Sequence, residues 1–91
     1  MRSSEQVKTR LIGLVAEGES LDPSDLEAFY RWMQASYEAL EFNPVRQEMF
    51  DECCRSSYDS YSMRIYKGVW MLELALNGDA SDDYHSRYSQ I

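Results

Sequence analysis

The side chains that could carry out chemistry are few, and their spacing does not suit it. Thiol and imidazole groups, the usual zinc ligands, are limited to Cys53, Cys54 and His85. Structural zinc needs about four such ligands at set spacing, and adjacent cysteines on a helix do not easily face one ion. A carboxylate di-metal site in a helical bundle needs a glutamate three residues before a histidine, and His85 lacks one. We therefore predict no metal site and no cofactor.

Catalytic and phosphate-binding motifs are also missing. Nucleophilic catalysis needs a base beside a serine or cysteine, and His85 lies in a polar stretch near the end of the chain. The four glycines are scattered rather than gathered in a phosphate-binding loop. Carboxylate pairs such as Glu48 with Glu52 are typical of a solvated helix face. The sequence predicts a protein that is not an enzyme and has no catalytic residue.

The acidic balance of the chain bears on its partners. The formal net charge is −7 at neutral pH, whereas nucleic-acid-binding proteins usually carry a basic patch. Residues 21–52 hold eight acidic side chains against Arg31 and Arg46, a balance of −6. An acidic face is expected here, at Glu27, Glu38 and Glu41. We therefore expect no direct binding of nucleic acid.

Tyrosines and cationic side chains gather in residues 55–67, a serine-rich stretch. Tyr, Trp and Arg are enriched at recognition hot spots, so the candidate interaction residues are Trp32, Arg55, Tyr58, Tyr61, Arg64 and Lys67. An anion site is one alternative. The alternative that we favour is a helix–helix junction in which the tyrosines pack and the arginines pair with acids of the preceding helix. Trp32 is either a second-face core residue or an exposed anchor, and Trp70 is expected in the core.

Helices must position these side chains, because apolar residues recur every three or four positions. Strand-forming Val, Ile and Thr number eight in all. The spacing predicts helices over about 4–17, 23–41, 44–56 and 60–77, packed as an all-α, compact antiparallel bundle of three to four helices. The apolar face of the second helix is predicted at Leu26, Phe29, Tyr30, Met33, Tyr37 and Leu40. That of the third is predicted at Val45, Met49, Phe50 and Cys53, with Cys54 on its flank.

The helix boundaries rest on capping residues. Asp22 and Pro23 predict the start of the second helix, since aspartate accepts the free amide hydrogens of a first turn and proline suits its first position. Asn43 and Pro44 repeat this pattern for the third helix. Gly18 is a predicted stop for the first helix.

The serine-rich stretch 55–62 predicts a break between the third and fourth helices, because hydroxyl groups compete for backbone hydrogen bonds. The alternative is one continuous helix over 44–77. From Val69 to Leu76 only Glu73 is polar, which indicates either the central helix of the bundle or a helix that partly faces another subunit. Residues 1–78 are expected to form one domain, and residues 79–91 a polar tail or a short fifth helix.

The lack of catalytic groups and the excess of Tyr and Trp favour a non-enzymatic protein–protein interaction module, with a homodimer as one form of it. A second hypothesis is an acidic decoy or inhibitor of a basic, nucleic-acid-binding protein. A third is a binder of small hydrophobic ligands whose pocket is lined by Tyr30, Tyr37, Trp70 and Met71, although an ordinary aromatic core fits these residues better. No run reaches the ~20 apolar residues that cross a bilayer, and no secretory signal is recognised, so a cytoplasmic protein is expected.

Overall fold

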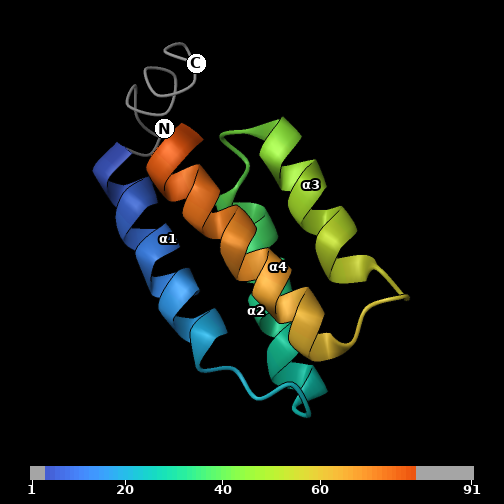
Figure 1. Cartoon of the computed structure of the whole chain (residues 1–91). Coiled ribbons are helices and arrows are strands. Elements are labelled where there is room, and N and C mark those ends of the chain that lie inside the picture. Colours follow the sequence, from blue (N-terminus) through green and yellow to red (C-terminus); the bar gives the residue numbers. More distant parts are fainter. Residues whose placement is uncertain (1–3, 80–91) are drawn as a thin grey trace.

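The computed structural model describes residues 4–79, which form an all-α bundle (Figure 1). Its elements are α1 (Ser4–Glu19), α2 (Leu26–Ala39), α3 (Pro44–Arg55) and α4 (Tyr61–Leu74), and α4 continues into one π-helical turn, Ala75–Asp79. The predicted fold class is confirmed. The expected tail or fifth helix and His85 lie outside the described residues.

The helices run alternately down and up, so that α1 begins and α4 ends at the same end of the bundle (Figure 1). The last helix, α4, lies between α1 and α3 and packs on both, with α2 behind it. It is therefore the central helix, the first of the two roles that its apolar run predicted.

The third and fourth helices begin at cap residues, with a break between them. The Asn43 side chain accepts a hydrogen bond from the Arg46 amide at 3.2 Å, and Pro44 takes the first helical position as predicted. The Ser60 hydroxyl accepts from the Met63 amide and starts α4. Residues 56–60 lie outside the helices, with a turn and a bend over 57–59, which confirms the break and excludes the continuous helix.

The start of the second helix was predicted three residues too early. Asp25, not Asp22, is its N-cap, and the Asp25 carboxylate accepts from the Ala28 amide at 3.1 Å. Asp22 accepts instead from the amide and hydroxyl of Ser24, at 2.9 and 2.8 Å. This local turn occupies Asp22 and leaves Pro23 in the loop, because aspartate satisfies a turn as readily as a helix end.

The buried face of α2 is rotated from the predicted one. Trp32 is 1% exposed, whereas Tyr30 is 47% and Leu26 43% exposed. The Trp32 indole N–H donates to the Leu14 carbonyl at 2.8 Å, and Tyr30 keeps its hydroxyl at the surface, as amphipathic tyrosines do. The rest of the core comes from all four helices: Leu11, Leu14, Phe29, Met33, Ala39, Leu40, Phe50, Cys54, Ile65, Val69, Met71, Leu72 and Ala75.

The apolar stripe of α3 is also shifted by one position. Cys54 is buried and Cys53 only half-buried, the reverse of the predicted order. Val45 is 70% exposed and Met49 39%, so of the four predicted stripe residues Phe50 alone lies fully in the core. The helix turns this edge inward because Phe50 packs edge-on against the Trp32 ring, at a centroid distance of 5.8 Å.

Two glycines make room for the buried indole. A methyl group placed on Gly18 would lie 2.6 Å from Trp32 Cζ2 and 2.6 Å from Val69 Cγ2, and one on Gly68 would lie 2.8 Å from Trp32 Cη2. Gly18 thus lies within α1 as a point of close approach, not as the predicted helix stop. Gly13 meets nothing within 4 Å.

Candidate functional site

The outward side of α4 presents large apolar side chains to solvent. Met63 is 44% exposed, Tyr66 70% and Trp70 54%. Their spacing of three and four residues places them on one side of the helix, and we call them the α4 outer face. Trp70 was expected in the core; the structure instead buries its neighbours Val69 and Met71.

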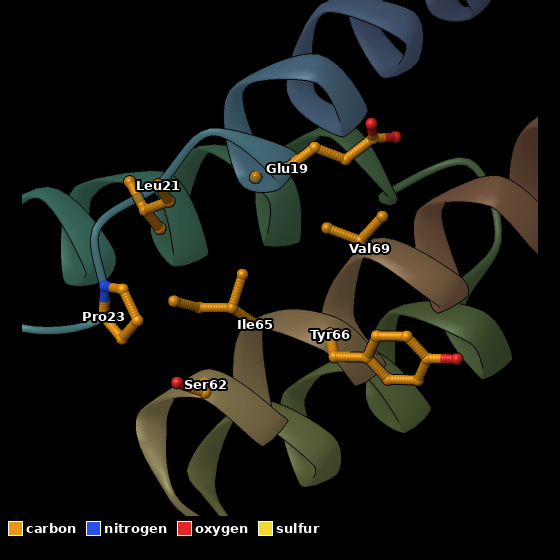
Figure 2. A pocket seen from close by; sticks show the side chains of 8 residues that line it. Glu19, Leu21, Pro23, Ser62, Ile65, Tyr66 and Val69 are labelled. Carbon is orange, nitrogen blue, oxygen red and sulfur yellow. The ribbon is translucent and has the colours of Figure 1, made fainter.

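A surface groove adjoins this face (Figure 2). It has a volume of about 400 Å³ and lies between the last turn of α1, the following loop and the first half of α4. Its lining residues are Gly18, Glu19, Leu21, Pro23, Ser62, Ile65, Tyr66 and Val69. Figure 2 shows Leu21 and Pro23 on one wall opposite Ile65, with Val69 continuing the α4 wall. Tyr66 belongs both to the groove and to the α4 outer face, which joins the two into one surface.

One side of the groove is formed by an acidic chain segment, residues 17–25, which we call its rim. Residues 17–25 contain four carboxylates and no Lys or Arg, namely Glu17, Glu19, Asp22 and Asp25. Glu19 lines the groove itself, and its side chain extends past Val69 (Figure 2). The hydrogen bonds from Ser24 lower the pKa of Asp22 below its ordinary 3.8, so this carboxylate is charged at neutral pH.

The predicted Ser/Tyr/Arg cluster forms the junction between α3 and α4, and its cations are engaged there. Arg55 pairs with Asp51 of α3 at 2.5 Å, and Lys67 pairs with Asp59 of the loop at 2.8 Å. Their partners are thus not the acids of α2 that we expected.

Two further members of the cluster meet at the same junction. The Arg64 guanidinium lies 4.7 Å from the centre of the Tyr61 ring, and Tyr61 packs edge-on against Phe29. Tyr58 is 99% exposed, apart from this packing. Trp32 is excluded as an exposed anchor because it is buried.

The four residues of the expected ligand pocket are not brought together. Met71 is 5% exposed, and its Sδ lies 3.9 Å from an Arg46 guanidinium nitrogen. Trp70 faces solvent, and the Tyr30 hydroxyl lies 3.3 Å from that of Tyr61. Tyr37 is 36% exposed on α2.

The acidic face expected on α2 is exposed and partly engaged. Glu27 pairs with Arg31 at 2.8 Å, and Glu38 accepts a hydrogen bond from Gln34 at 3.2 Å. Glu41 is exposed just beyond the helix end. These residues do not line the groove.

The two cysteines are free thiols with little nucleophilic character. Burial raises the pKa of the Cys54 thiol to about 12, and burial also raises the pKa of Cys53. Because the thiolate is the nucleophile, neither group is activated near neutral pH. Among residues 4–79, no group of three or more His, Cys, Asp and Glu side chains is placed to hold a metal ion. Over the same residues, no helix is both long and apolar enough to cross a membrane.

Sequence reasoning missed the groove because its walls come from segments about forty residues apart. Leu21 and Pro23 looked like the entrance to a helix, and Ile65 and Val69 looked like ordinary core residues. The one available signal was an apolar Leu21 between acidic loop residues.

Comparison with known proteins assigns no family. No family model matches the chain, and no curated protein and no solved structure matches it significantly.

Proposed function

We propose that this protein is a non-enzymatic protein-interaction module whose contact surface is the α4 outer face together with the adjoining groove. The observation that carries the proposal is the exposure of Trp70 and Tyr66 on the central helix of the bundle. Trp and Tyr are the side chains most enriched at binding hot spots. Large apolar groups that gather on a soluble protein's surface mark interaction sites.

The position of these two side chains supports the same function. The core closes around Trp32, Phe29 and Phe50 without either of them, so folding alone does not account for large aromatics at positions 66 and 70. The helix that carries them packs on α1, α2 and α3, which holds the face rigid. A rigid surface loses little conformational entropy on binding.

The test compares two purified variants with the wild-type chain as bait. Tyr66→Ala combined with Trp70→Ala removes the aromatic part of the surface, and Tyr58→Ala removes an aromatic side chain that is 99% exposed elsewhere. Proteins captured from cells are identified by mass spectrometry and then titrated in purified form. We expect the double variant to lose the partner and Tyr58→Ala to keep it.

Equal binding by all three proteins would contradict the proposal. Circular dichroism of each bait checks that the helices are intact, which we expect because both replaced side chains are largely exposed.

A further inference from the structure

The groove is mainly apolar and its rim is acidic, and the two properties together select a partner. The floor and walls are apolar, with Leu21 and Pro23 on the loop side and Ile65 and Val69 on the α4 side. Glu19 lines the groove, and the segment 17–25, which supplies the α1 and loop side of the lining, carries three further carboxylates. An apolar groove bordered by negative charge is complementary to a segment that presents an apolar side chain flanked by positive charges.

The salt bridges of residues 4–79 do not involve this rim. Lys67 and Arg55 pair with Asp59 and Asp51 at the other junction, and Arg31 pairs with Glu27 on α2. Neither Glu17 nor Glu19 joins an ion pair within residues 4–79. The eight lining residues include Glu19 as their single charged side chain.

We infer that the groove binds a cationic amphipathic segment of another protein, with an aliphatic side chain seated over Ile65 and Val69 and a flanking Lys or Arg side chain facing Glu19. This inference rests on the proposed function and names its partner class. The net charge of −7 on the whole chain attracts a basic segment as it approaches, and the carboxylates of the rim add to this attraction.

The same charges disfavour the other occupants. A second copy would bring two chains of −7 together, with one acidic rim against another surface of an acidic protein. The chain's own residues 80–91 carry two Asp and one Arg, a formal −1 with His neutral, and so lack the positive charge that the rim selects.

The binding test uses three synthetic peptides of about 14 residues, or four helical turns. One is an amphipathic Leu/Lys peptide, one has the same residues in scrambled order, and one is the Leu/Glu counterpart. Binding is followed by amide chemical shifts of the ¹⁵N-labelled full chain. We expect the Leu/Lys peptide alone to bind well and to shift Gly18, Ile65, Tyr66 and Val69.

Matched charge reversals separate the rim from overall acidity. Glu17→Lys with Glu19→Lys should weaken binding of the Leu/Lys peptide about tenfold, through the lost ion pair at Glu19 and the lost attraction of the nearby Glu17 charge. Glu38→Lys with Glu41→Lys changes the net charge equally on exposed positions away from the groove, and should weaken it less than about threefold. Raising the salt concentration from about 50 to about 500 mM should weaken binding of the Leu/Lys peptide to the wild-type chain and to the Glu38/Glu41 variant.

Three results would overturn the inference: equal losses in the two double reversals, shifts that map away from the groove, or equal binding of the Leu/Glu peptide. A dimer in light scattering that the Glu17/Glu19 reversal leaves intact and that covers the groove would assign it to a second copy instead.

The cellular capture experiment distinguishes this inference from the proposed function. If capture requires Tyr66 and Trp70 but survives the Glu17/Glu19 reversal, the surface binds a partner of another chemistry, and the inference alone fails. If capture survives both sets of changes, the proposed function fails as well.

Discussion

Replacing single glycines by alanine tests the packing around Trp32, because the chain offers a close approach and a matched open position on the same helix. Gly18→Ala places a methyl group 2.6 Å from both Trp32 Cζ2 and Val69 Cγ2, at least 0.8 Å short of the 3.4 Å at which ordinary contact begins. Gly13→Ala places one where nothing lies within 4 Å. Both glycines lie within α1, so the difference between the variants reports the contact.

The indole has no room to retreat from the added methyl group. Trp32 is 1% exposed, its N–H donates to the Leu14 carbonyl at 2.8 Å, and Gly68 and Phe50 also pack close to the ring. Overpacking of such a site costs about 1–3 kcal/mol. Alanine in place of glycine returns up to about 1 kcal/mol in a helix interior, and less in a last turn such as that of Gly18. The expected net loss for Gly18→Ala is about 1–2 kcal/mol.

Gly13→Ala should instead stabilise the protein by about 1 kcal/mol, because only helix propensity changes there. Urea titrations followed by circular dichroism give both free energies of unfolding. Thermal midpoints should separate by roughly 4–8 °C for each kcal/mol of difference in a domain of this size. If Gly18→Ala proves as stable as Gly13→Ala, the close approach of α1, α2 and α4 at Trp32 is wrong.

Three further predictions concern buried groups. Ser36 is fully buried and its hydroxyl has no hydrogen-bond partner among residues 4–79, so Ser36→Ala should raise the free energy of unfolding in urea by about 1 kcal/mol; a loss of that size would show a missed partner. Trp32→Phe should lower it by about 2 kcal/mol through lost packing and the unmade bond to Leu14, and its fluorescence should be red-shifted relative to Trp70→Phe, since the remaining tryptophan is then the exposed one; the opposite order of emission would contradict the placement of the indoles. Burial holds the pKa of the Cys54 thiol at about 12 against an ordinary 9.0. Because the unfolded chain ionises first, the free energy of unfolding should fall by about 1.4 kcal/mol per pH unit above pH 9 up to pH 12, but not below pH 9. Cys54→Ala should make that slope shallower in parallel urea titrations, leaving the contribution of Cys53, and an unchanged slope would refute the assignment.

The features that sequence reasoning predicted well depend on neighbouring residues alone. Asn43 with Pro44 marks a helix start whatever lies around it, and the serines of 55–62 weaken a helix locally. The start of α2, predicted at Asp22 and Pro23, was wrong because it does not depend on neighbouring residues alone. Asp22 and Asp25 have the same chemistry, and the choice between them depends on a loop that carries Leu21 and Pro23 over α4.

Which tryptophan is buried could not be predicted from the sequence. Trp32 and Trp70 each lie beside apolar residues, and the rotation of a helix about its axis is decided by what faces it. Gly18 and Gly68 create the space for one indole, but they lie fifty residues apart and meet only after folding. The groove follows from the same tertiary arrangement, since Glu19 and Tyr66 share a surface only when α1 and α4 are packed together.

The order of the helices along the chain has a consequence for synthesis of the protein. Because α4 fills the space between α1 and α3, a nascent chain that has emerged only through residue 60 leaves Leu11, Phe29 and Phe50 without the cover that α4 provides. The hydrophobic core can form cooperatively only after Ile65, Val69 and Leu72 have left the ribosome. Until then the nascent chain exposes apolar side chains that chaperones can bind. A fragment truncated before Tyr61 should therefore be degraded rapidly in cells.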